Sequence, residues 1–203
     1  EKKIEELLSV KNNNSGKFLY SNSAGHIISH IILKKTKMTP MEFASSNLFP
    51  FLGIGLIRWD DGYLSINDGS TNMYLTLRDM VKLGQLYLQE GFSGNKKVLS
   101  TNWINQATSF KVPVKNMGSN FFENLMLRLA GISFPKAYGY LWWLPNYAGS
   151  FLATGYGGQY ILVIPDKNLV IGTQSKISEK IFENLSNQEK LIEAIFEKIV
   201  PHL

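Results

Sequence analysis

The histidines are the first residues whose types and spacing could do chemistry. His26 and His30 stand four positions apart in a segment whose isoleucines recur with helical spacing, so both imidazoles would share one helix face. A zinc-protease helix needs a Glu directly after the first His, and the residue here is Ile27. No third ligand is evident in the sequence. We therefore expect a half-buried structural helix and no metal site.

A glycine-rich segment, residues 154–159 with the sequence TGYGGQ, could be compared with a phosphate-binding loop. Such a loop follows a strand, opens a helix and carries Lys-Ser or Lys-Thr at its end. Here residues 159–164 alternate in strand fashion, so a strand follows and the phosphate interpretation fails. The glycines suit either a tight hairpin or a strand edge that lets the backbone approach a ligand, and composition does not decide between them.

A third motif, Tyr20-Ser21-Asn22, stands just before the first predicted helix. A tyrosine beside a cation can act as a general base, because a neighbouring positive charge lowers the pKa of a phenol. The alternative is structural, with Asn22 at the N-cap of the helix and Tyr20 as a packed aromatic ring. The tripeptide alone does not distinguish the two roles.

Helices and strands must position these motifs, and they separate along the chain. Helices are predicted from Ser23 to about Lys35, from a capping box at residues 39–42 to about 48, from 76 and from 100. Strands are predicted at 138–144, 151–155, 159–164 and 169–173, with a turn at 165–168. A second capping box at residues 186–189 predicts a final helix that ends at Pro201. The pattern indicates an α+β protein with a mostly helical region, 1–136, and a region of antiparallel strands and a C-terminal helix, 137–203.

Composition excludes several function classes. Hydrophobic residues make up 44% of the 203 and charged residues 18%, which is typical of a globular protein. The absence of cysteine excludes disulfides, thiolate metal sites and a cysteine nucleophile. The net charge of +5 comes from dispersed lysines with few arginines, which argues against nucleic acid as a partner. No apolar run approaches the roughly 18–20 residues of a membrane span, and a chain that begins at Glu1 without a leader is expected to be processed or part of a longer protein.

Five segments, in the same order along the chain, resemble the serine β-lactamases of class C type and their relatives. Residues 20–22 resemble the Tyr-x-Asn motif of that family, and residues 153–159 (ATGYGGQ) resemble the strand that carries its Lys-Thr-Gly or His-Thr-Gly motif. The other three matches are residues 47–54 (NLFPFLGI), 75–87 and 138–143 (YGYLWW). The wider group contains esterases, D-amino-acid peptidases and 6-aminohexanoate-oligomer hydrolases.

The resemblance implies a β-lactamase/transpeptidase-like fold and a serine hydrolase that cleaves an ester, amide or lactam through an acyl-serine intermediate without a cofactor. It implies catalytic roles for Tyr20, which would help to move the proton of the nucleophile, and for Tyr156, whose backbone N–H would bind the oxyanion. Substrate-binding roles fall to Asn22, Thr154, Gly155, Gly157 and Gln159. The usual location of the family implies a periplasmic or secreted protein.

The nucleophile of the family is the Ser of a Ser-x-x-Lys motif upstream of Tyr-x-Asn, and nothing upstream of residue 20 fits it. Ser93 and Lys96 have the spacing, but Ser93-Gly94-Asn95 is typical of a turn. Ser133 and Lys136 have it too, but the proline at 135 precludes a regular helix there. We therefore expect an N-terminal segment of the same protein to carry the nucleophile, and this chain alone to be inactive.

Ala153 is a second departure, because the family has Lys or His at this position to anchor a substrate carboxylate. Its absence favours an esterase or amidase over an efficient β-lactamase. Both departures also leave open a non-catalytic module of this fold that binds peptidoglycan-type ligands.

Overall fold

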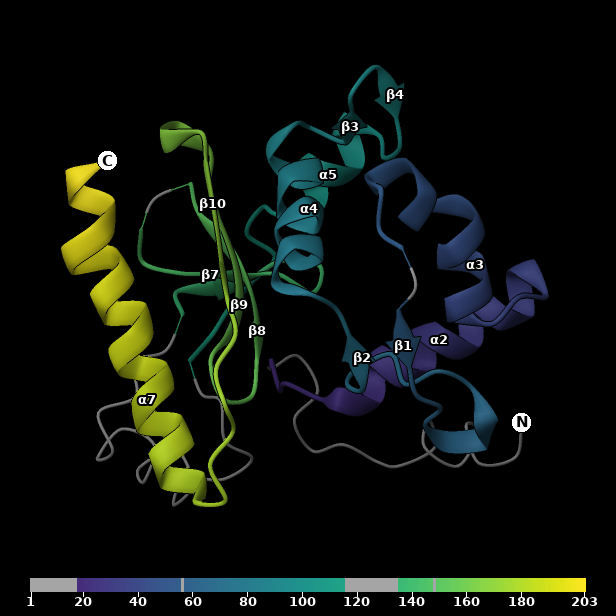
Figure 1. Ribbon diagram of the computed structural model, residues 1–203, viewed down its shortest axis with the longest axis horizontal. Coiled ribbons are helices and arrows are strands. Elements are labelled where there is room, and N and C mark those ends of the chain that lie inside the picture. The colour runs from purple at the N-terminus through teal and green to yellow at the C-terminus, as the bar shows by residue number, and fades with distance from the viewer. Residues whose placement is uncertain (1–17, 56, 116–134, 148) are drawn as a thin grey trace. The chain divides into compact units, whose positions relative to one another are not determined.

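The structure is a computed structural model that describes residues 18–55, 57–115, 135–147 and 149–203 (Figure 1). Its chain forms two compact units, one ending at Tyr74 and the other beginning at Leu75. The helical stretch and polar segment expected within residues 1–16, and Ser133 of the second Ser-x-x-Lys spacing, lie outside the described residues. Among the described residues, none of the helices combines the length and the apolar character that crossing a bilayer requires.

The first unit is mainly helical. Its elements are α2 (Asn22–Thr36), α3 (Pro40–Asn47), η1 (Phe49–Leu52), β1 (Arg58–Trp59), η2 (Tyr63–Ser65) and β2 (Met73–Tyr74), and β1 pairs with β2 in an antiparallel arrangement. The predicted capping box at the start of α3 is confirmed. The Thr39 hydroxyl accepts the N–H of Glu42 at 3.2 Å, and the Glu42 carboxylate accepts the N–H of Thr39 at 2.7 Å. This reciprocal pair satisfies two of the backbone donors that open a helix.

The second unit is built on an antiparallel sheet of six strands in the order β10-β9-β8-β7-β6-β5. Its strands are β5 (Val112–Pro113), β6 (Ala137–Tyr138), β7 (Trp143–Leu144), β8 (Phe151–Gly155), β9 (Gln159–Ile164) and β10 (Leu169–Thr173). The predictions for the last three strands are confirmed to the residue. The single strand predicted at 138–144 is wrong, because the chain turns there: the Gly139 N–H donates to the Trp142 carbonyl at 2.8 Å, and Leu141 has a left-handed φ of 63°.

Helices cover both faces of this sheet, α4 (Leu77–Leu88) on one and α7 (Ile181–Ala194) on the other (Figure 1). A Cβ on Gly84 of α4 would lie 2.6 Å from Val170 and 2.8 Å from Ile161, so glycine lets this helix approach β9 and β10 closely. The predicted helix starts at 76 and 100 are confirmed, since Thr76 caps α4 and Ser100 caps α5 (Thr101–Ala107). The helices and the antiparallel sheet confirm the predicted α+β class.

The start predicted for the last helix is wrong. Residues 186–189 lie inside α7, which begins five residues earlier and continues as η4 (Ile195–Ile199) and η5 (Val200–His202). A Ser and a Glu three residues apart are neighbours on any helix face, so the capping-box pattern alone cannot mark a start. The start is stabilised by a contact that the pattern does not encode: the side chain of Asn184, the fourth residue of α7, accepts the N–H of Ser178 at 2.7 Å.

A hairpin of β3 (Phe92–Ser93) and β4 (Lys96–Lys97) holds the first Ser-x-x-Lys spacing. Ser93 and Lys96 pair across this hairpin, and Gly94 between them has a left-handed φ of 55°. A nucleophile of the Ser-x-x-Lys type needs both side chains on one helical turn. The expected turn is therefore confirmed, and this pair does not form the motif.

Candidate functional site

The predicted site residues fall into two groups, one in each compact unit. Tyr20 and Asn22 lie at the start of α2 in the first unit. The remaining ones belong to the β8–β9 hairpin of the second unit, namely Thr154, Gly155, Tyr156, Gly157 and Gln159. The structure thus brings together the members of each group, and each group is described by itself.

Tyr20 directly precedes the N-cap of α2, and its side chain is 42% exposed. The N-cap is Ser21 and not Asn22, which is the exposed first residue of the helix. The structural alternative of an Asn22 N-cap is therefore wrong. Partial burial raises the pKa of Tyr20 above its ordinary value. This direction is opposite to the one that a neighbouring cation would produce and that a general base needs.

The start of α2 is held against the loop 66–72 by a contact between two backbones. A Cβ on Gly25 would lie 2.7 Å from the carbonyl oxygen of Gly69. A Cβ on Gly69 would lie 2.1 Å from the carbonyl oxygen of Gly25 and 2.5 Å from the hydroxyl of Ser29. Only glycine at both positions permits this approach, which fixes where the helix that follows Tyr20 begins.

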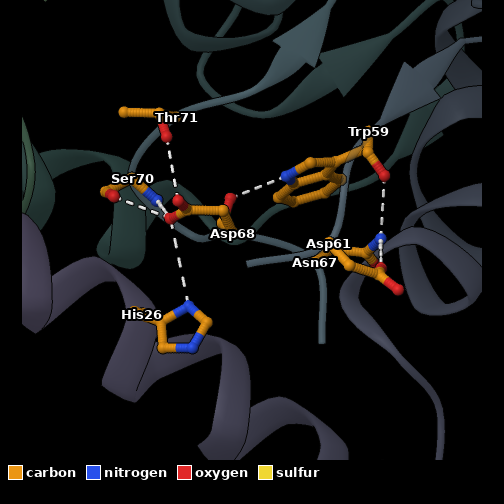
Figure 2. A network of polar contacts seen from close by, with 7 residues as sticks. All are labelled: His26, Trp59, Asp61, Asn67, Asp68, Ser70 and Thr71. Carbon is orange, nitrogen blue, oxygen red and sulfur yellow. Dashed lines mark hydrogen bonds and ion pairs between the residues drawn. The ribbon is translucent and has the colours of Figure 1, made fainter. Parts of the chain in front are cut away.

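Asp68 is the centre of a polar network that accompanies this contact (Figure 2). One carboxylate oxygen accepts the N–H and the hydroxyl of Ser70 at 2.9 and 2.7 Å, and the other accepts the hydroxyl of Thr71 at 2.8 Å. Nδ1 of His26, on α2, lies 3.9 Å from the carboxylate, and the Trp59 indole donates to the Asp68 backbone carbonyl at 2.7 Å. Burial alone would raise the pKa of Asp68, but the hydrogen bonds from Ser70 and Thr71 and the His26 charge outweigh it and leave the pKa lowered.

Asn67, only 6% exposed, extends the network to α3. Its amide nitrogen donates to the Trp59 carbonyl at 2.9 Å and to the Asp61 carboxylate at 3.1 Å, and its amide oxygen accepts the N–H of Met41 at 3.0 Å. Sequence reasoning missed the roles of Asn67 and Asp68. The run Asn-Asp-Gly-Ser at 67–70 signals a turn but does not reveal which side chains the turn collects.

The two histidines of α2 contact each other, and His26 also lies beside the Asp68 carboxylate. Their rings meet edge to face with centroids 5.0 Å apart, and burial lowers the pKa of His30. Nε2 of His30 is buried and has no hydrogen-bond partner among the described residues. Within the same residues, no group of three or more His, Asp or Glu side chains is placed to hold a metal ion.

The β8–β9 hairpin turns through three residues, Tyr156, Gly157 and Gly158, of which the two glycines have φ of 83° and 88°. Of the two alternatives for this segment, the tight hairpin is therefore the one that the structure shows, and its tip packs closely against the segment that follows β10. A Cβ on Gly157 would lie 2.9 Å from Ile177, and the Gln159 side chain donates to the Ser175 carbonyl at 3.0 Å. The side-chain amide nitrogen of Gln159 thus binds the segment that follows β10.

Tyr156 presents two different groups at the tip of the hairpin. Its side chain is 46% exposed, and its hydroxyl accepts a hydrogen bond from the amide of Asn184 at 2.9 Å. Its backbone N–H has no hydrogen-bond acceptor among the residues that the structure describes. An unpaired N–H beside a glycine at the end of a strand can donate to the oxygen of a bound carbonyl compound.

Two residues of α7 that sequence reasoning missed hold this tip. Asn184 is 2% exposed and contacts Tyr156 and both backbone groups of Ser178. Gln188, one helical turn later, donates to the carbonyl of Gly155 at 3.1 Å. No signal in the sequence indicated this pair, because Asn184 stands before the helix start that was predicted at residues 186–189.

Solved structures with the same fold are found, although no protein-family model and no curated protein matches the chain. A Bacillus anthracis protein described as a 6-aminohexanoate-dimer hydrolase matches with a TM-score of 0.64 and 23% identity, over 93% of this chain and 46% of that one. A Bacteroides dorei protein described as a β-lactamase matches with a TM-score of 0.68 and 16% identity, over 96% of this chain and 62% of that one. The chain thus spans about half of the first structure and less than two thirds of the second.

These likenesses define the class of protein by its fold. The fold is β-lactamase-like, as the resemblance of the five sequence segments implied, and it is a hydrolase-type fold. At this level of identity the likeness concerns the fold alone, so activity has to be argued from the site.

Proposed function

We propose that this chain is part of a β-lactamase-related serine hydrolase that acts on an ester, amide or lactam, and that its nucleophile lies on an N-terminal segment of the same protein. The unpaired backbone N–H of Tyr156 is the observation that carries the proposal. It stands at the end of β8, where the family resemblance expects a donor to the oxyanion. Half an oxyanion hole is of little use alone, because removal of one donor typically costs about 10²–10³ in rate.

In the proposed reaction, the serine Oγ bonds to the substrate carbonyl carbon, and the lysine of its motif and Tyr20 take up the serine proton. The carbonyl oxygen becomes an oxyanion that accepts hydrogen bonds from the Tyr156 N–H and from the serine N–H. The bond to the leaving alcohol or amine then breaks, and the leaving group receives the proton. Water cleaves the acyl-serine in the same way and releases the carboxylic acid.

The substrate is a small carbonyl compound that lies along the end of β8. Asn22 would hydrogen-bond a substrate amide, and the strand from Thr154 to Gly157 would lie beside the substrate, with Gln159 at its border. Ala153 offers no cation for a substrate carboxylate, which favours an esterase or amidase. Because the related enzymes are usually periplasmic or secreted, we propose the same location for this protein.

A second candidate is a non-catalytic module that binds peptidoglycan-type ligands. The raised pKa of Tyr20 favours it, because a phenol that stays protonated donates hydrogen bonds to a ligand but does not accept a proton from a nucleophile. In this case the Tyr156 N–H would bind a ligand carbonyl without any reaction.

Labelling with a serine-reactive fluorophosphonate, followed by denaturing intact mass measurement, separates the two candidates. The 22.9 kDa chain and the longer protein with its Ser-x-x-Lys segment are treated in parallel, with heat-denatured samples as controls. The hydrolase proposal expects an adduct on the longer protein, located on that segment, and none on this chain. An adduct on this chain would mean that its nucleophile lies within it, against the proposal. No adduct on either sample would favour the binding module.

A further inference from the structure

The peptide group between Gly155 and Tyr156 is hydrogen-bonded to α7. Its carbonyl oxygen accepts a hydrogen bond from Nε2 of Gln188 at 3.1 Å. Gln188 is itself anchored, because its backbone carbonyl accepts the hydroxyl of Tyr160 at 2.9 Å. Tyr160 is 4% exposed and belongs to β9, so the helix is tied to the sheet at the residue that reaches the hairpin.

This hydrogen bond decides where the N–H of Tyr156 points. A peptide group is planar and trans, so its C=O and N–H point in opposite directions. If the Gly155 oxygen is directed at α7, the Tyr156 N–H is directed away from α7. The unpaired donor and the bonded acceptor described above are thus the two ends of one rigid group.

The peptide group between Gly155 and Tyr156 stands where the β8–β9 ladder ends, since Gly155 and Gln159 are its last pair. A peptide flip needs changes in ψ of Gly155 and φ of Tyr156, and a glycine tolerates both values of ψ because it has no Cβ. The next two residues are glycines with positive φ, and glycine restricts the backbone less than any other residue. In the flipped form a carbonyl oxygen would replace the N–H and repel an oxyanion.

We propose that Gln188 is a positioning residue that keeps the Tyr156 N–H directed toward the oxyanion. Asn184 supports it through its hydrogen bond to the Tyr156 hydroxyl. The inference rests on the proposed function for the catalytic use of that N–H. It adds that α7, on the far side of the hairpin, controls whether the oxyanion donor is formed.

Two variants test the role of the Gln188 donor. Gln188→Leu keeps a similar volume and removes the donor. Gln188→Glu donates to the Gly155 oxygen only while its carboxyl group is protonated, so its effect must depend on pH. Asn187→Leu and Asn187→Asp are matched controls, because Asn187 is an exposed neighbour on the same helix.

Two readouts are needed, one without catalysis. In this chain, the ¹³C shift of the Gly155 carbonyl and the ¹⁵N shift of Tyr156 report the peptide group, and both should move in Gln188→Leu but not in Asn187→Leu. In the longer protein with its Ser-x-x-Lys segment, Gln188→Leu should lower kcat for ester hydrolysis by about 10- to 100-fold and leave KM within about twofold. The loss should not exceed that expected when one oxyanion donor is removed completely. The ratio of Gln188→Glu to wild-type kcat should rise as the pH falls and the glutamate becomes protonated.

The outcomes distinguish the inference from the function on which it rests. Unchanged shifts in Gln188→Leu would overturn the inference whatever the activity. Changed shifts with a wild-type kcat, or a Gln188→Glu ratio that does not change with pH, would also overturn it. If the wild-type longer protein hydrolyses no ester and takes no fluorophosphonate, the proposed function fails, while the shifts still decide whether Gln188 holds the peptide group.

Discussion

Replacing Gly69 by alanine should destabilise the first unit strongly. The added Cβ would lie 2.1 Å from the Gly25 carbonyl oxygen and 2.5 Å from the Ser29 hydroxyl. A Cβ needs more than about 3 Å to its neighbours, so one of the two backbones must move by about 1 Å. A rotamer change of Ser29 could relieve the second contact, but no side chain can relieve the first. The helix α2 and the loop 66–72 must therefore separate.

The cost is worked from this geometry. Over-packing of a close contact typically costs about 1–3 kcal/mol, and we expect about 2–3 kcal/mol because the obstacle is backbone. This corresponds to a roughly 30- to 150-fold loss in the folding equilibrium. The separation also strains the hydrogen bond from the Trp59 indole to the Asp68 carbonyl, so the indole N–H resonance of Trp59 reports on this unit specifically. Urea titration monitored at that resonance gives the free energy of unfolding.

Gly55→Ala is the matched control, because it lies in the same unit and its added Cβ would contact nothing within 4 Å. It removes backbone freedom from the unfolded chain just as the Gly69 variant does, so the difference between the two variants isolates the clash. A free energy of unfolding for Gly69→Ala within about 0.5 kcal/mol of that for Gly55→Ala would refute the packing argument.

Two further predictions concern ionisable groups whose pKa is shifted. Asp68→Asn should lower the free energy of unfolding by about 1–2 kcal/mol at pH 7. The difference from wild type should shrink as the pH falls through the lowered pKa of Asp68, because a lowered pKa stabilises the fold only while the carboxylate is ionised. Urea midpoints at pH 7 and at acid pH check this, and a difference that does not depend on pH would contradict it. Burial raises the pKa of Tyr160 to about 12, so its contribution to stability is present below the ordinary tyrosine pKa of about 10 and is lost as the pH rises toward 12. The free energy of unfolding of wild type should therefore fall by roughly 2–3 kcal/mol relative to that of Tyr160→Phe over that interval. If both proteins lose the same stability between these pH values, the effect does not come from Tyr160.

Local signals predicted those elements whose boundaries local chemistry decides. The capping box of Thr39 and Glu42 satisfies its own backbone donors, so the start of α3 is encoded within four residues. The strands β8 to β10 are separated by turns at glycines and at Pro165, and these turn signals, together with the alternation of residues 159–164, set their predicted bounds. The block at 138–144 failed because its aromatic residues favour a strand, while Gly139 and Leu141 form a turn that the pattern did not reveal.

The residues of the candidate site were chosen from sequence motifs, and their roles stay predictions. Tyr20 and the hairpin from Thr154 to Gln159 were named from their motifs, and the hairpin was one of two stated alternatives. The residues that orient them were not, because their partners lie far along the chain. Gln188 reaches Gly155 across 33 positions, and the approach of Gly25 to Gly69 depends on how two elements pack. Such contacts leave no periodic trace in the sequence.

The pKa of Tyr20 bears on how the proposed hydrolase would be assembled. Its own surroundings raise the pKa through burial, so a general base formed by Tyr20 needs a cation to reverse the shift. In the proposed mechanism, Ala153 supplies none, because it stands where the family that the sequence resembles commonly has Lys or His. The lysine of the Ser-x-x-Lys segment is the remaining source in the proposed mechanism. The same segment would then supply the nucleophile, the second oxyanion donor and the charge that makes Tyr20 a base. In the proposed mechanism, activity therefore depends on that segment in an all-or-none way, and we expect a chain without it not to cleave its substrate.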